Sequence, residues 1–152
     1  MTLAQRLHAD MQRALRAGDA LRVSTIRLVR AAAQNLEIER GGPLTDEDFQ
    51  GVITHEAKRR REAIEAFAKG GRDDLVQKES LELAILSEYL PAQLSESELR
   101  AIVAATAAAV GAHSERDTGK VMAAVMPQVK GRADGAAVNA LVREWLRERA
   151  PQ

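Results

Sequence analysis

Apolar residues recur along this chain every three or four positions, in stretches separated by short groups of glycine and proline. This is the period of an α-helix that buries one face, and it differs from the strict alternation of a half-buried strand. The pattern predicts an all-α chain of about seven helices without a sheet. The helices are expected to begin near Thr2, Asp19, Thr45, Asp73 or Asp74, Ser95, Ser114 and Asp134.

The ends of the expected helices carry clear signals. Thr2 with Gln5, and Ser95 with Glu98, have the spacing of a capping box, in which side chains satisfy the first backbone amides. Glycines that can stop a helix stand at positions 18, 41, 70 and 111. Because a residue before proline avoids the α conformation, the sixth helix is expected to end near Met126, ahead of Pro127.

The character of the helices changes in the middle of the chain. The first four are mostly long and rich in charge, and the last three are short and rich in alanine. We therefore expect a long-helix N-terminal bundle over residues 1–92 and a small three-helix tail subdomain over residues 93–152. The tail subdomain is expected to share one core made of Leu99, Val103, Val121, Val125, Leu141 and Trp145.

Composition limits the possible partners and the compartment. The chain has 152 residues, no cysteine, and 22 basic against 22 acidic residues, so any binding to nucleic acid must be local. No apolar run approaches the ~18 residues of a membrane span, so we expect no membrane partner. Charges occupy the place of a signal peptide's apolar region, which makes a cytoplasmic location the expectation.

The sequence offers no recognisable catalytic, cofactor or metal motif. His8, His55 and His113 have no known metal-ligand spacing, and each is expected to be a surface or hydrogen-bonded histidine. Gly119 and Lys120 lack the remaining residues of a phosphate-binding P-loop. We therefore expect no catalytic residues, no metal and no cofactor, and no enzyme activity of the chain on its own.

Three stretches carry a family resemblance: LRVSTIRLVRAAAQNLEIE (21–39), EAKRRREAIEAFAKGGRDDLVQKESLELAILSEYLPAQLSESEL (56–99) and DTGKVMAAVMPQVKGRADGAAVNALV (117–142). With EYLPAQL, GKVM and KGRADG, the chain resembles the YqeY family of small bacterial proteins. That family is similar to the C-terminal tail region of the B subunit of aspartyl/glutamyl-tRNA amidotransferase, where the region contacts tRNA. The resemblance implies a helical N-terminal part, a small helical tail and an RNA-binding role without catalytic machinery.

Three basic clusters are candidates for such binding. The main one joins Lys120 to the loop residues Lys130, Gly131, Arg132 and Gly135, because a helix start with nearby cations and glycines can hold a phosphate. Two secondary clusters are Arg27 with Arg30, and the run Lys58, Arg59, Arg60 and Arg61. Arginine suits a carboxylate as well as a phosphate, and the run has acidic neighbours typical of a salt-bridged surface.

The loop also has a purely structural interpretation. Gly131 can supply a left-handed turn, Asp134 can cap the last helix, and Gly135 can allow close helix packing. Asp134 would also repel a phosphate placed near it. The two interpretations stay open from the residues alone, and the family resemblance favours RNA.

Three functions of different class remain. The first is a non-catalytic accessory module that binds tRNA or another structured RNA through phosphate contacts. The second is a protein-interaction or assembly module, which predicts an exposed apolar patch on the long helices. The third is a component of a glutamine-dependent carbon-nitrogen ligase that acts only with partner subunits, such as amidotransferase or other translation proteins.

Overall fold

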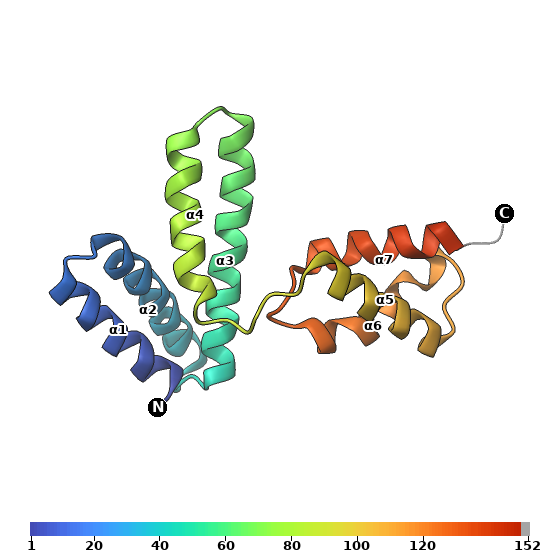
Figure 1. Ribbon diagram of the computed structural model, residues 1–152. Helices are drawn as coiled ribbons and strands as arrows, with labels where there is room; N and C mark the ends of the chain where they lie inside the picture. The colour runs from blue at the N-terminus through green and yellow to red at the C-terminus, as the bar shows by residue number, and fades with distance from the viewer. Residues whose placement is uncertain (150–152) are drawn as a thin grey trace. The chain divides into compact units, whose positions relative to one another are not determined.

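The structure is a computed structural model that describes residues 1–149 (Figure 1). Over these residues the chain forms seven α-helices, one short 3-10 helix and no strand, so the all-α prediction is confirmed. The elements are α1 (Leu3–Ala17), α2 (Ala20–Arg40), α3 (Asp46–Lys69), α4 (Asp73–Ser87), α5 (Glu96–Val110), η1 (Glu115–Asp117), α6 (Thr118–Val129) and α7 (Gly135–Arg149). The chain divides into two compact units, Met1–Pro91 and Ala92–Gln152, called here the N-terminal and C-terminal units; residues 150–152 lie outside the described part.

Side-chain caps begin several helices, and left-handed glycines end them. Complete capping boxes stand at the starts of α1, α3 and α5, on Thr2, Thr45 and Ser95. Gly18, Gly41 and Gly111 have φ angles of 73°, 76° and 69°, and each follows the last residue of its helix. These local signals set the element boundaries because they satisfy backbone groups that the helix itself leaves unpaired.

The predicted end of the sixth helix was wrong. Helix α6 does not end at Met126 but continues through Pro127 to Val129. Val129 is fully buried and extends the four-residue series of Val121 and Val125, so core packing outweighs the backbone amide that proline lacks. Helix α4 begins at Asp73, as expected, although the residue before it, Arg72, makes no side-chain cap.

The core of the N-terminal unit is built from two helical hairpins. Helices α1 and α2 form one, and the long α3 and α4 form the other (Figure 1). Leu7, Ile26, Ile53 and Leu86, one from each helix, are at most 1% exposed. Leu15 continues the four-residue series of Leu3, Leu7 and Met11 but is 50% exposed, because a strict four-residue spacing drifts around a helix of 3.6 residues per turn and Ala14 takes the buried position.

A buried ion network joins α3 to α4. Arg60 lies 2.5 Å from a carboxylate oxygen of Glu56 and 3.4 Å from one of Glu82, and all three side chains are at most 9% exposed. The more exposed Arg59 adds a second cation 3.5 Å from Glu56. Two carboxylates and two guanidinium groups thus compensate one another beside the core, where an unpaired charge would be costly.

Tyr89, just after α4, links the second hairpin to α1. Its hydroxyl donates a hydrogen bond to a carboxylate oxygen of Asp10 at 2.5 Å, and the guanidinium of Arg6 lies 4.7 Å from the ring centre. Burial, together with this hydrogen bond, raises the pKa of Tyr89 well above its ordinary value.

The C-terminal unit has its own small core. It consists of Leu99, Val103, Ala107, Val121, Val125, Val129, Val138, Leu141, Val142 and Leu146. Five of the six expected core residues are therefore buried together. Trp145 is only partly buried and packs at the edge of this core, with the guanidinium of Arg149 3.9 Å from its ring centre.

Replacing Arg60 by methionine should strongly destabilise the N-terminal unit. The variant leaves Glu82 buried without a cation and Glu56 with only the exposed Arg59, for which we expect a loss of about 3–5 kcal/mol in the free energy of unfolding. Urea unfolding followed by near-ultraviolet circular dichroism in a Trp145→Phe background, where Tyr89 is the single strong chromophore, measures this unit. The matched variant Arg59→Met removes a 64% exposed side chain and should cost less than about 1 kcal/mol. Equal losses in the two variants would contradict the network.

Alkaline pH should destabilise the same unit through Tyr89. Since the pKa of this phenol is higher in the folded than in the unfolded chain, its contribution to stability is complete below pH 10 and is lost as the pH rises above that value. Phenolate absorbance should therefore emerge only together with loss of helix. The variant Tyr89→Phe should show a flatter dependence of stability on pH in this range, and an unchanged dependence would argue against the prediction.

Removing Leu146 should cost more than removing Trp145. Leu146→Ala empties a fully buried position and should cost about 2–5 kcal/mol, whereas Trp145→Ala should cost less than about 3 kcal/mol because part of the ring faces solvent. Urea unfolding followed by far-ultraviolet circular dichroism compares the two variants. The reverse order would show that the indole ring is the centre of this core.

Candidate functional site

The KGRADG loop between α6 and α7 is tied to the segment that precedes α5. The backbone amide of Leu94 donates to the carbonyl of Arg132 at 2.8 Å, and the Gln93 side chain donates to the carbonyl of Gly131 at 2.9 Å. The Nε of Arg132 donates to the carbonyl of Ala92 at 3.2 Å. This loop therefore has a structural task, which is to hold residues 92–94 against the C-terminal unit.

The glycines and the aspartate of this loop have mostly local structural roles. Gly131 has a φ angle of 77°, a left-handed conformation that side chains disfavour. Asp134 accepts a hydrogen bond from the amide of Ala137 at 3.3 Å and so caps α7. At Gly135 an added Cβ would meet the end of the Met126 side chain at 3.9 Å, an ordinary contact, so close packing does not demand a glycine there.

Lys120 does not join the loop. It stands in the first turn of α6, whereas Lys130 directly follows the last turn, and ten residues of helix separate charges by about 15 Å along the axis. The charge of Lys120 acts instead on Asp117, whose pKa is lowered first by hydrogen bonds from the amides of His113 and Ser114 and further by this lysine.

The run of cations on α3 does not form one binding surface. Lys58 and Arg59 are exposed, Arg61 is half-buried, and Arg60 is enclosed between Glu56 and Glu82. Including Arg60 among the RNA-binding candidates was wrong, because its guanidinium is bound to carboxylates away from solvent. Its position on the buried side of α3 depends on Glu82, which lies 22 residues further along the chain.

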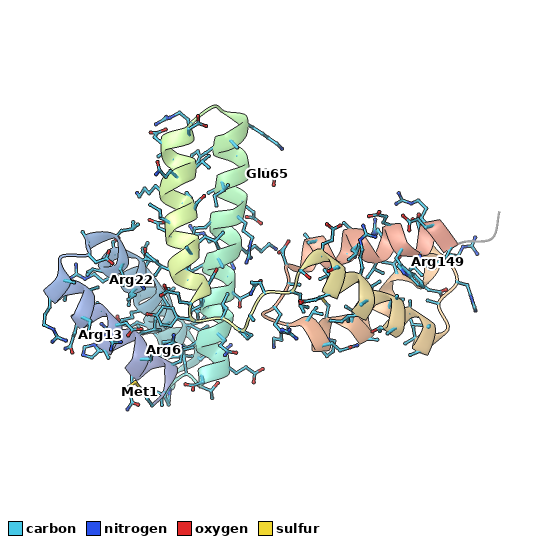
Figure 2. The ribbon with its side chains drawn as sticks, viewed as in Figure 1. Met1, Arg6, Arg13, Arg22, Glu65 and Arg149 are labelled. Atoms are coloured by element: carbon cyan, nitrogen blue, oxygen red, sulfur yellow. The ribbon has the colours of Figure 1, made fainter. Side chains whose placement is uncertain are left out.

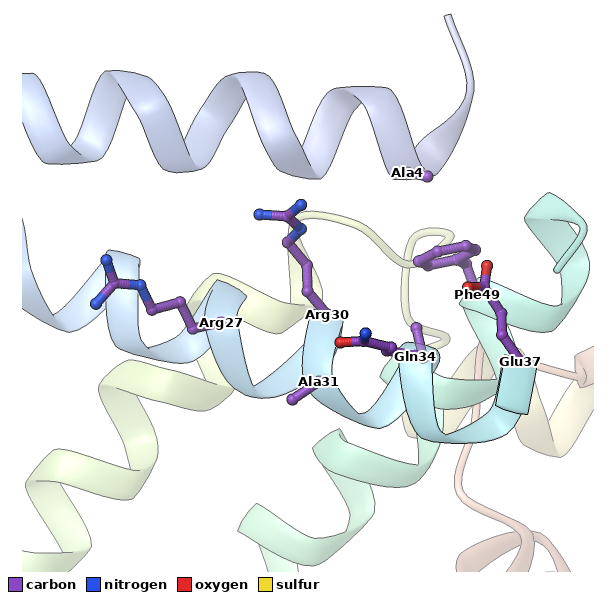
Figure 3. Close-up of a pocket in the computed structure, with 8 residues that line it drawn as sticks. Ala4, Arg27, Arg30, Ala31, Gln34, Glu37 and Phe49 are labelled. Atoms are coloured by element: carbon purple, nitrogen blue, oxygen red, sulfur yellow. The ribbon is translucent and has the colours of Figure 1, made fainter. Parts of the chain in front are cut away.

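Arg27 and Arg30 line a groove of about 540 Å³ on the α2 side of the first hairpin (Figure 3). Arg30 reaches the sulfur of Met11 at 3.4 Å, and neither arginine forms an ion pair within the described residues. Ala4 and Phe49 form apolar parts of the lining, and Glu37 stands at the far end of the groove (Figure 3). Sequence reasoning found the two arginines but not the concave surface, because that surface requires α1 and α3 to pack beside α2.

A second groove lies beside the same hairpin, and its charges are compensated internally. Arg6, Arg13 and Arg22 line it together with Asp10, Asp19 and Glu88, and these three arginines are labelled in Figure 2. Arg22 binds Glu88 at 2.6 Å, Arg13 binds Asp10, and Arg6 lies 3.9 Å from Asp10. The two grooves differ in that only the first presents arginines without carboxylate partners.

The histidines and the other potential metal ligands of the described residues form no further candidate site. His8, His55 and His113 are all exposed. Over residues 1–149, no group of three potential metal ligands gathers, and no helix is both long and apolar enough to cross a membrane. The candidate surfaces are thus the α6–α7 loop and the groove with Arg27 and Arg30.

Fold and surfaces define a small helical protein of two units whose candidate sites are open charged surfaces rather than a deep cavity. A family model described as Yqey-like protein matches residues 4–146. The chain belongs to the YqeY family.

Curated relatives carry the name "Altered inheritance of mitochondria protein 41, mitochondrial". The protein of Eremothecium gossypii is 39% identical over 57% of this chain and 48% of its own length. That of Pyrenophora tritici-repentis is 32% identical over 91% of this chain and 78% of its own length. The protein of Lachancea thermotolerans is 37% identical over 64% of this chain and 54% of its own length. The chain thus spans about half the length of the first and third of these relatives.

These names correct one expectation. A cytoplasmic location was expected from the charged N-terminal residues, and this is wrong, because the curated relatives are named mitochondrial proteins. A charged start excludes only the apolar region of a secretory signal peptide, which is one targeting signal among several.

Proposed function

We propose that this protein is a non-catalytic accessory module that binds tRNA or another structured RNA through phosphate contacts of its C-terminal unit. The observation that carries the proposal is the arrangement of Arg132. Its Nε is held by the carbonyl of Ala92, while its two terminal amino groups make no hydrogen bond within the described residues. An arginine fork that is oriented by the backbone is suited to a phosphate, because both terminal groups can donate to the same anion.

The neighbours of Arg132 support an anion at this position. Lys130 is exposed and lies two residues away, and Gly131 between them has no side chain that would block the approach of a phosphate. Asp134 already occupies an amide at the start of α7, so the side chains of Lys130 and Arg132, more than the helix end, are the groups proposed to bind.

Folded RNA fits this surface better than single-stranded RNA. Stacking of splayed bases needs exposed aromatic rings. Within the described residues, Phe49 and Tyr89 are buried, Phe67 and Trp145 are half-buried, and Arg149 lies over the ring of Trp145. Phosphate contacts remain as the means of recognition. The resemblance to the tail of the tRNA amidotransferase B subunit supports the same class of partner.

Binding to bulk tRNA should depend steeply on salt and on the two loop cations. In fluorescence anisotropy titrations at several salt concentrations, Lys130→Gln/Arg132→Gln should weaken binding and reduce the slope of log affinity against log salt by about two units, one for each lost phosphate contact. The loss should be similar for different folded RNAs, because phosphate contacts carry little sequence information.

A charge-matched control separates this site from general electrostatics. Arg116→Gln/Arg143→Gln removes two exposed charges of the same unit and should reduce the slope by less than one unit. All variants must first be shown to unfold at the same temperature. If Arg132→Gln lowers the unfolding temperature, Lys130→Gln alone replaces the double variant. No binding of wild type to bulk tRNA at low salt, or equal effects of test and control variants, would refute the proposal.

A further inference from the structure

The groove that contains Arg27 and Arg30 continues along the whole first hairpin. Beyond Arg27, a second hollow of about 300 Å³ lies at the α1–α2 turn, lined by Leu15, Val23, neighbouring small residues and Asp19, whose carboxylate is paired with Arg22. Arg27 lines both hollows, so they form one surface, called here the α1–α2 groove. One end of the groove is apolar, its centre is basic, and Glu37 stands at its other end.

Arg27 and Arg30 differ from the other arginines that line a groove of this hairpin. In the neighbouring charge-compensated groove, Arg6, Arg13 and Arg22 each lie against a carboxylate. Arg27 and Arg30 have no carboxylate partner within the described residues, although they lie three residues apart on one helical face. Like charges held side by side are unfavourable, and an acidic partner would relieve this repulsion.

Exposed apolar side chains accompany the unpaired arginines. Leu15 in the groove and Leu28 beside it on α2 are each 50% exposed, and Ile38 is 73% exposed. Ile38 follows Arg27 by eleven residues, which places it on the same face of α2. A surface that combines aliphatic side chains with unpaired arginines is typical of protein interfaces, where arginine is enriched and lysine depleted.

We propose that the α1–α2 groove binds an acidic amphipathic helix of a partner protein. Its apolar face packs against Leu15 and Ile38, and its carboxylates bind Arg27 and Arg30. Arg30 and Glu37 are seven residues apart, about 10 Å along α2. A basic residue of the partner helix, about two turns from the carboxylates that bind the arginines, would therefore lie opposite Glu37. This is the helix-in-groove mode of recognition, with anchors at helical spacing.

The features of the groove favour a protein over RNA. Glu37 repels phosphate, and the exposed aliphatic side chains offer nothing to a sugar-phosphate backbone. This inference concerns residues of the N-terminal unit, whereas the proposed RNA site lies in the C-terminal unit. Failure of one therefore leaves the other in place.

Site-specific photocrosslinking of the full-length chain in its own cells tests this inference. A benzoylphenylalanine in place of Ala31, which lines the groove, should capture a protein segment whose acidic and apolar residues recur at helical spacing. The same residue in place of Ala17, which lines the charge-compensated groove, is the matched control and should not capture that segment. The variant Arg27→Gln/Arg30→Gln should reduce the adduct about tenfold, as expected for two partly exposed charge pairs. Arg16→Gln/Lys78→Gln, an equal change of charge elsewhere on exposed positions, should leave the adduct within about twofold.

A synthetic peptide of the captured segment completes the test. It should bind wild type, and about tenfold more weakly when its carboxylates are replaced by amides or when the protein carries Arg27→Gln/Arg30→Gln. The inference is overturned if Ala31 captures no more than Ala17, if the adduct is RNA or a second copy of this chain, or if loss of the two arginines leaves the adduct unchanged.

Discussion

Burial of a narrow apolar stripe on each helix is the constraint on which the rest of this structure depends. Such stripes are too narrow for one large core, and the helices pack as two small units, each with its own cluster of aliphatic side chains. Charged residues then stand immediately beside the cores. Arg60 shows the consequence, because a guanidinium at the edge of the stripe is stable only between the carboxylates of Glu56 and Glu82.

The two candidate surfaces are best understood from how charges pair within the chain. Many arginines lie against carboxylates of the same chain, and among those without such a partner, the ones that line a groove or are oriented by the backbone are suited to bind a partner. Arg27 and Arg30 belong to this class, and so does the terminal fork of Arg132. The groove combines its arginines with exposed aliphatic side chains, as protein interfaces do, whereas the loop offers little besides cations and glycine, which suits a phosphate.

The residues of the candidate sites could be found in the sequence, but their accessibility could not. The left-handed turn at Gly131 and the cap by Asp134 follow from residue type, since both act within a few positions of the backbone. The run on α3 looked uniformly basic, and only packing against α4 distinguishes the enclosed Arg60 from the exposed Arg59. The groove beside Arg27 is made by three helices, so no local pattern indicates it.

By itself, the sequence determined the helices, the capped starts of α1 and α5, the glycine stops and the absence of a sheet over the described residues, together with the family. These features depend on backbone groups and side chains within about one helical turn of each other. Only the tertiary structure decided that α6 continues through Pro127, that Trp145 lies at the edge of its core, and that Arg22 binds Glu88 across 66 residues. Each of these depends on what another helix places opposite the residue, and packing between elements can outweigh local preference.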